Sequence, residues 1–254
     1  GKDYLHPNFE LIFDEILEQN AKQKLTNFLK KWLESKIDTI LKSLVDLKNL
    51  KEKNSSIKAL AYQLYENNGV LKRENVSEYL KNLGQNERKI LRGLGVKFGR
   101  YHVFLYRLIK PDAVSLRTML WKNFNQKFFH LKPPTFGLNF IDDKNLKNKS
   151  FMLLCGFEKF NNFYIRIDIL ERLFVQIINS NSEKEIKMVP EMLNLLGCNK
   201  ENFKKLLKEM GYKIILRENE IFFKYTPKKN LKKNFSKKIT KESPFEVLKN
   251  ISFN

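Results

Sequence analysis

The chain has 254 residues, which is room for one large domain or for two to three small ones, and 42% of them are hydrophobic and 13% aromatic, enough to form buried cores and to exclude wholesale disorder. Lysine and arginine number 48 against 28 acidic residues, so the formal charge is +20. Such a charge excludes polycations as partners and favours polyanions, nucleic acid before an anionic membrane surface, whereas the plain alternative is a lysine-rich solvated surface.

Residues 8–50 are predicted to form two helices. Apolar side chains recur at three- and four-residue spacing on both sides of a polar break at residues 19–24, and the second helix is expected to run unbroken to about Leu50. We expect residues 1–55 to be a helical segment that packs on the rest, with a partner-binding helix as the alternative. The apolar positions before the break are Phe9, Ile12, Phe13, Ile16 and Leu17.

Residues 56–125 are predicted to form a first winged-helix-like unit, a helix–turn–helix followed by a β-hairpin, with one further helix after it. Glycines punctuate this stretch, and Gly99 and Arg100 form the hairpin turn. Pro111 suits the first turn of the last helix. The expected helices span residues 57–66, 74–83, 87–94 and 111–124, and the expected strands span residues 96–98 and 101–105.

Residues 126–150 are expected to be a linker or loop, and residues 151–226 a second winged-helix-like unit. Asp168 is placed to cap a helix that starts at Ile169. Residues 227–254 are predicted to be a basic tail, with eight lysines against two acidic residues. The second unit is expected to contain strands at 151–157, 163–167, 212–217 and 221–225, and helices at 169–179, 190–196 and 200–210.

The two predicted units share residues as well as layout, which indicates an internal repeat. The leucines would fill one helix face, the glycines permit left-handed helix ends, and the asparagines can cap the third helix. Generic helical hairpins with attached β-ribbons are the alternative. At a displacement of 113, Val76, Glu78, Leu80, Leu83, Gly84 and Asn86 match Val189, Glu191, Leu193, Leu196, Gly197 and Asn199, and after a three-residue length difference Leu91, Gly95 and Lys97 match Leu207, Gly211 and Lys213.

The third helix of each predicted unit is the candidate nucleic-acid-binding element, because in a helix–turn–helix its polar face meets phosphates and base edges. The hairpins and the tail would add contacts to phosphates. A solvated helix face is the alternative for any single lysine. The candidate residues are Arg88, Lys89, Arg92, Lys97 and Arg100 in the first unit, Lys200, Lys204, Lys205, Lys208, Lys213 and Arg217 in the second, and Lys228 and Lys229 in the tail.

Catalytic chemistry is not expected from this chain. It has no phosphate-binding P-loop motif, and its three histidines stand apart from acids and cysteines at useful spacing, with His102 expected to line the hairpin. The adjacent Asp142 and Asp143 are a weak metal signal in a lysine-rich loop. The sequence therefore predicts no cofactor and no metal in this chain, and whether it belongs to an enzyme stays open.

Export and membrane insertion are not expected either. The two cysteines, Cys155 and Cys198, lack partners at metal-ligand spacing, so a disulfide framework and a zinc site are improbable and a reducing cytoplasm fits. The longest apolar runs are too short to span a bilayer, and the amino terminus lacks a signal-peptide core.

Several stretches resemble one helicase group, the alphaproteobacterial relatives of the mitochondrial RNA-degradosome helicase in superfamily 2. The resemblance covers roughly residues 60–250, and the first block is the most specific. Tyr106 departs from the pattern, where a proline is expected. The blocks are residues 91–100 with 103–105, 108–111, 116–117 and 120–121, then 156–157 with 165–173, 195–198 with 210–213, and 243–248.

The resemblance implies a carboxy-terminal accessory region of an ATP-dependent RNA helicase, in which ATP and Mg²⁺ belong to motor domains that lie upstream and are absent here. RNA, or DNA, would be the substrate, with the motor domains and a ribonuclease as protein partners. Two other hypotheses remain open, a protein-docking scaffold and a stand-alone helix–turn–helix DNA-binding protein. An exposed apolar patch on residues 8–50, with lysines spread evenly over the surface, would favour the scaffold, and a symmetric dimer would favour the DNA-binding protein.

Overall fold

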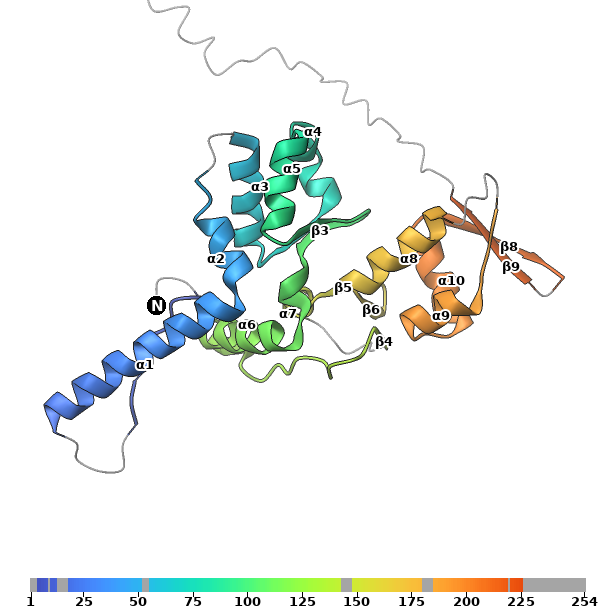
Figure 1. The fold of residues 1–254 in the computed structure, drawn as a ribbon. Coiled ribbons are helices and arrows are strands. Elements are labelled where there is room, and N and C mark those ends of the chain that lie inside the picture. The colour runs from blue at the N-terminus through green and yellow to red at the C-terminus, as the bar shows by residue number, and fades with distance from the viewer. Residues whose placement is uncertain are drawn as a thin grey trace, which may run out of the picture.

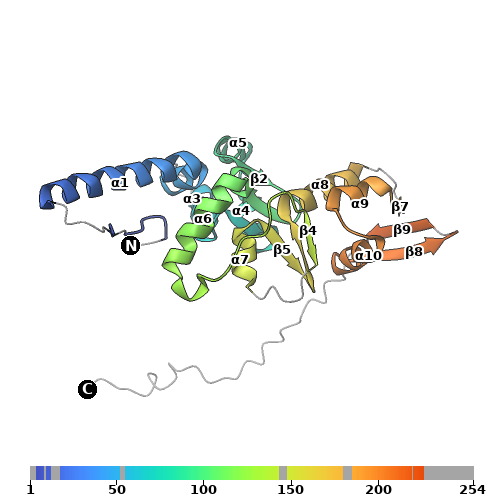
Figure 2. The ribbon, with the colours of Figure 1, turned by 90° about the horizontal axis from the view of Figure 1, so that it is seen from below.

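The computed structural model describes residues 4–8, 10–12, 18–51, 55–142, 148–179, 185–218 and 220–225. This part of the chain is mainly helical, with three small antiparallel sheets of three strands each. The elements follow one another from the long helix α1 at one end to the β8–β9 hairpin at the other (Figure 1). The same order is visible from below (Figure 2).

The two amino-terminal helices are α1 (Gln19–Ile40) and α2 (Lys42–Lys48). The predicted break at residues 19–24 is wrong, because glutamine, alanine and lysine interrupt an apolar stripe without opposing helix formation. The chain instead bends at Leu41, which is fully buried. Residues 10–12 are not helical, although a helix was expected there. The other expected stripe residues, Phe9, Phe13, Ile16 and Leu17, lie outside the described residues.

The first helix–hairpin unit has the predicted helices and a strand that the sequence did not indicate. The extra strand, β1, pairs with β3, so the sheet order is β1-β3-β2. The helix expected at residues 74–83 begins as a 3-10 turn and becomes a short α-helix. The elements are α3 (Ser55–Glu66), β1 (Val70–Lys72), η1 (Arg73–Val76), α4 (Ser77–Lys81), α5 (Gln85–Gly93), β2 (Val96–Phe98) and β3 (His102–Leu105).

The middle of the chain differs from the prediction in two places. The strand expected at residues 151–157 is mostly helix α7 (Lys149–Leu154), because the Asn148 side chain accepts a hydrogen bond from the Phe151 N–H and caps it. The expected loop at 126–150 contains strand β4, which pairs with β6 to give the order β4-β6-β5. The remaining elements are η2 (Tyr106–Ile109), α6 (Pro111–Phe124), η3 (Gln126–Phe128), β4 (Phe140–Asp142), β5 (Phe157–Phe160) and β6 (Phe163–Arg166).

The carboxy-terminal unit again has a helix, a strand, two helices and a hairpin. Its sheet order is β7-β9-β8. Asp168 lies inside the first turn of α8 and pairs with Arg166 at 2.7 Å, so it does not occupy the expected cap position before the helix. The elements are α8 (Ile167–Asn179), β7 (Ile186–Lys187), α9 (Pro190–Leu196), α10 (Lys200–Glu209), β8 (Tyr212–Arg217) and β9 (Glu220–Tyr225).

A helix–glycine–hairpin element occurs three times, once in each sheet, where the sequence indicated two. Gly95, Gly156 and Gly211 each follow a helix by two residues and precede a strand directly, with φ of +92°, +86° and +84°. Each glycine donates its N–H to the carbonyl three residues earlier. Because L side chains rarely adopt such a φ, glycine is required at all three junctions. Other matches of the predicted repeat fail: Gly197 is left-handed but Gly84 is extended, and Asn199 caps α10 whereas Asn86 lies within α5.

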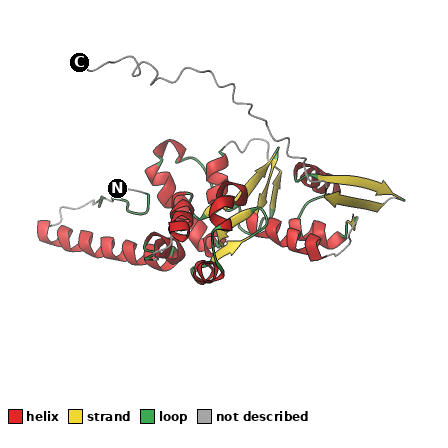
Figure 3. Cartoon of the chain, turned by 90° about the horizontal axis from the view of Figure 1, so that it is seen from above, coloured by secondary structure: helices red, strands yellow, loops and turns green. Residues whose placement is uncertain are grey.

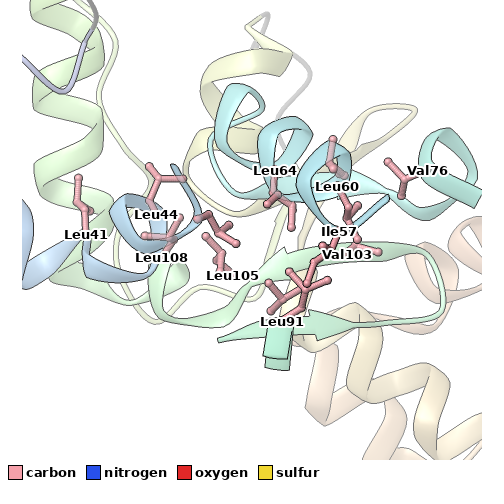
Figure 4. Packing of buried hydrophobic residues seen from close by; sticks show 14 of the residues in the cluster. Leu41, Leu44, Ile57, Leu60, Leu64, Val76, Leu91, Val103, Leu105 and Leu108 are labelled. Carbon is pink, nitrogen blue, oxygen red and sulfur yellow. The ribbon is translucent and has the colours of Figure 1, made fainter. Parts of the chain in front are cut away.

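The main amino-terminal core joins α2, α3 and the first sheet. Leu41, Leu44, Ile57, Leu60 and Leu64 meet the strand residues there with almost no exposure (Figure 4). A second core fills the space between α8, α9, α10 and the β8–β9 hairpin. Helices and small sheets follow one another along the molecule, and the helices do not form one continuous layer (Figure 3).

Candidate nucleic-acid interface

The candidate residues on α5 are divided between structural and exposed roles. Arg88 donates to the carbonyls of Leu80 and Leu83 at 2.5 and 3.2 Å, so it stabilises the α4–α5 turn. Lys89 and Arg92 are exposed on the outer side of the helix. Arg92 and Arg88 both lie over the ring of Phe98, which attaches α5 to the β2 strand. Only part of the predicted cationic set on α5 is therefore available to a ligand.

Three of the four candidate lysines of α10 are exposed, and the fourth, Lys204, is partly exposed. The buried side of α10 packs on the second core through Phe203, Leu206 and Leu207. Lys204 forms an ion pair with Glu201 at 2.9 Å on the same helix. Lys200, Lys205 and Lys208 are exposed, and no ion pair to them is found among the described residues. These three lysines form the cationic side of α10.

The outer face of the β8–β9 hairpin is a second basic surface. Lys213 lies directly opposite Lys224 in the strand register. The next pair on the same face of the hairpin is Ile215 with Phe222. Like charges placed directly opposite each other destabilise a sheet, so their presence favours an anionic ligand as their counterpart. Arg217 is less available, because it pairs with Glu185 at 2.8 Å.

The hairpin turn of the first unit holds a buried carboxylate that sequence reasoning missed. The Glu171 side chain of α8 accepts hydrogen bonds from the backbone N–H groups of Arg100, Tyr101 and His102, the last two at 2.9 and 2.8 Å. A Cβ at Gly99 would lie 2.3 Å from the Glu171 carboxyl carbon. The exposed side chain of Arg100 therefore projects from a turn whose backbone is fixed by another unit.

His102 lies at the centre of this buried cluster rather than merely lining the hairpin. Its Nδ1 is 3.3 Å from Glu171 and its Nε2 is 3.1 Å from Glu158 on β5. Lys72 on β1 contacts the other Glu158 oxygen at 3.0 Å. Burial opposes a charged imidazole, but the two carboxylates outweigh burial and raise the pKa of His102 above 6.5. The same contacts lower the pKa of Glu158 below 4.5 against the effect of its burial.

The cluster joins residues that are far apart in the sequence. Glu158 and Glu171 have no motif spacing to His102, since 56 and 69 residues separate them. Isolated acids at such distances carry no recognisable signal, so only the packing of β3, β5 and α8 reveals them. Two carboxylates, Glu158 and Glu171, thus face two basic groups, Lys72 and His102, and the arrangement is a charge-balanced junction.

Two cavities flank the β2–β3 hairpin. The first, about 560 Å³, lies beside Arg73, Arg100, Tyr101, Lys159 and Glu209. The second, about 410 Å³, lies on the other side of the hairpin, between Lys97, Phe98, Tyr106, Lys110 and Arg172. Two of the predicted residues, Lys97 and Arg100, thus border different cavities.

The structure does not bring the predicted residues into a single patch. Helices α5 and α10 lie apart, separated by α8 and the first hairpin (Figure 1). Lys97 is exposed on β2 and Arg100 at the turn, whereas Lys213 is on the outer face of the last hairpin. Lys228 and Lys229 lie outside the described residues. The described cations therefore form several separate basic surfaces along an extended molecule.

Comparisons with protein-family models, with curated proteins and with solved structures found no match. Among the described helices, none combines the length and the apolar character that crossing a membrane requires. Within the same part of the chain, no group of three or more histidine, cysteine or acidic side chains is arranged to hold a metal ion.

Proposed function

We propose that this chain is the nucleic-acid-binding accessory region of an ATP-dependent RNA helicase, contacting RNA phosphates while a motor elsewhere unwinds the duplex. The motor would supply ATP and Mg²⁺ chemistry. A cytoplasmic location and a ribonuclease partner belong to the same proposal. The helicase assignment rests on the sequence resemblance, and the nucleic-acid assignment rests on charge and surface geometry.

The element order supports winged-helix-like units. In the first and last units a helix, a strand, two helices and a hairpin follow one another, and the first strand pairs with the second strand of the hairpin. This arrangement presents the third helix, α5 or α10, and a hairpin to a ligand. Winged helices also bind proteins, so the exposed charge has to decide between the two uses.

The observation that carries the proposal is the basic surface of the last unit. Lys200, Lys205 and Lys208 are exposed on α10, and Lys213 faces Lys224 on the hairpin. Folding alone gains nothing from opposed lysines, whereas an RNA phosphate backbone would stabilise them. Lys97 and Arg100 offer further phosphate contacts from the first unit.

The test is fluorescence anisotropy with single-stranded and duplex RNA, and with DNA of the same sequence, across a salt series. We expect binding to RNA that weakens as salt rises, and the Lys205→Gln/Lys208→Gln variant to reduce the slope of log affinity against log salt by about 1.4, because each lost single-strand phosphate contact changes it by about 0.7. Lys30→Gln/Lys31→Gln, which removes two exposed lysines from α1, is the matched control and should leave binding unchanged.

Absence of RNA binding by the wild-type chain at low salt would reject the proposal. A clear preference for DNA, together with a symmetric dimer, would support the DNA-binding alternative instead. If both double variants lost the same affinity, binding would depend on net charge alone and α10 would not be the interface.

Protein docking is a second candidate function, because α1 has an unpacked apolar side. Phe28 and Trp32 are 64% and 51% exposed, and Leu25 continues the same stripe one turn earlier. Among the residues of α1, Ile37 is buried and anchors the carboxy-terminal end. Apolar stripes of this kind commonly bind partner surfaces, and the motor domains of the same protein are the partner that the helicase proposal supplies.

A further inference from the structure

A cavity of about 410 Å³ lies between the first hairpin and α8. It combines aromatic and cationic side chains, which the phosphate-binding side of a helix does not need. It is bordered by β2, by the 3-10 turn η2 and the start of α6, and by one side of α8. Its walls combine charged and apolar side chains, and the apolar ones include the buried Phe104, the half-buried Ile109 and the exposed Val175. Its volume lies within the range of about 300–1,000 Å³ that small-molecule sites occupy.

The acids of this cavity are neutralised within the protein. Asp168 is held by Arg166 in a two-point ion pair at 2.7 and 3.2 Å. Glu171 is directed into the hairpin turn, where three backbone N–H groups and His102 surround it. Neither carboxylate is available to balance the cations at the mouth.

Three cations remain at the mouth, Lys97, Lys110 and Arg172, and all are exposed. No ion pair to any of them is found in the part of the chain that the structure describes. The Lys110 Nζ lies 4.8 Å from the ring centroid of Tyr106 and 3.2 Å from its hydroxyl, so a cation and an aromatic ring stand side by side. The Tyr106 side chain is 38% exposed, and Phe98, on β2, is half-buried and lines the same cavity.

We infer that this cavity binds one unstacked nucleotide of single-stranded RNA, with the base against Tyr106 and Phe98 and the phosphate at Lys97, Lys110 and Arg172. Aromatic side chains stack on a flat base, and exposed cations bind the phosphate attached to it. Proteins bind single-stranded nucleic acid by this combination of stacking and charge. The inference rests on the proposed function, which it deepens by assigning a single-strand site apart from the phosphate-binding side of α10.

The experiment compares the wild-type chain with Tyr106→Ala and with Lys110→Gln/Arg172→Gln, measured by anisotropy on a ten-nucleotide RNA and on a blunt RNA duplex. Loss of one base-stacking contact is expected to weaken single-strand binding by about fivefold to a hundredfold and duplex binding much less. Tyr62→Ala, which removes a tyrosine from α3 that is more exposed than Tyr106 (61% against 38%), is the control and should leave both affinities unchanged. The substituted side chains are all exposed, and circular dichroism checks that the variants fold.

A second measurement locates the contact directly. RNA that carries 4-thiouridine is cross-linked by long-wavelength light, and the cross-linked peptide is expected to contain Tyr106 or Phe98. Adenosine monophosphate alone is tested as a competitor, and it is expected to compete far more weakly than the ten-nucleotide RNA.

The results distinguish failure of the cavity inference from failure of the proposed function. If the wild type binds RNA and Lys205→Gln/Lys208→Gln weakens it while the Tyr106 and Lys110/Arg172 variants behave like wild type, the cavity inference fails and the proposed function stands. If the wild type binds no RNA, both fail. If adenosine monophosphate binds as tightly as the oligonucleotide, the cavity takes a free nucleotide and the RNA inference is wrong.

Discussion

At the scale of single residues, the charges that matter most to this fold are the ones that face inward. Arg117 is completely buried and donates to the carbonyls of Asn68, Leu108 and Leu154, between 2.5 and 2.9 Å. Burial lowers the pKa of this guanidinium to about 10, so it stays charged at neutral pH and joins three segments through backbone oxygens. Arg117 contributes to the net charge of +20, but its contacts are structural and it is not available to a polyanion.

Gly99 provides a residue-scale test of the buried carboxylate. Replacing Gly99 with alanine places a Cβ against the Glu171 carboxylate, which burial and three backbone N–H groups hold in place. We expect Gly99→Ala to lower the free energy of unfolding by about 1–3 kcal/mol, the cost of disturbing buried hydrogen bonds, as measured by urea denaturation.

Gly93→Ala is the matched control for that substitution. Its Cβ meets nothing within 4 Å, and it lies at the end of α5, where alanine is the better helix former. It is expected to keep or slightly raise stability. If Gly99→Ala were as stable as the wild type, the hydrogen bonds of Glu171 would not require glycine at position 99.

At the scale of elements, the three helix–glycine–hairpin junctions share a packing rule. The residue four before each glycine, Leu91, Met152 and Leu207 in turn, is buried against its own sheet. The left-handed glycine then reverses the chain so that the next strand starts within the core. Helix α1 is the exception among the elements, since most of its length has no sheet or helix beneath its apolar side (Figure 1).

The unpacked side of α1 yields the element-scale prediction. We expect Phe28→Ser/Trp32→Ser to leave the thermal unfolding temperature nearly unchanged, because exposed side chains contribute little to the core. The same variant should weaken binding to separately produced helicase motor domains, measured by isothermal titration calorimetry. Ile37→Ser, which opens the packed end of the helix, should by contrast lower the unfolding temperature. Unaltered motor binding by the double variant would count against the docking role.

At the scale of the whole molecule, a buried charged cluster and an apolar contact are among the links between the units. Glu158 belongs to the second sheet, His102 and Lys72 to the first, and Glu171 to α8 of the last unit. Val70, Phe104 and Ile167 form an apolar contact between the same parts. The charged cluster therefore contributes to the relative placement of the basic surfaces.

Stability is accordingly predicted to depend on pH. Because the folded pKa of His102 is raised above 6.5, its contribution is fully present below pH 6.5 and is lost as pH rises through the raised value. Because the folded pKa of Glu158 is lowered below 4.5, its contribution is present above pH 4.5 and is lost as pH falls through the lowered value. We expect maximal stability between these limits in urea titrations at a series of pH values.

His102→Gln is expected to remove the decline above pH 6.5, whereas His130→Gln, at an exposed histidine, should retain it. A wild-type stability that rises between pH 6.5 and 8 would contradict a charged His102 in the folded state.

The sequence alone determined most helices and the last two hairpin strands, because apolar period, proline and glycine act locally at positions such as Pro111, Pro190 and Gly211. It also determined the net charge, and with it the expectation of a polyanionic partner. It did not indicate β1, β4 or β7, since these three strands of two or three residues exist only through pairing with a distant hairpin. Tertiary structure alone decided which charges are buried: Arg88 and Arg117 are used by backbone carbonyls, and Glu158, Glu171 and His102 meet across 56 to 69 residues. Long-range electrostatic contacts leave no periodic trace in a sequence, so the division between structural charges and exposed charges could be read only from the folded chain.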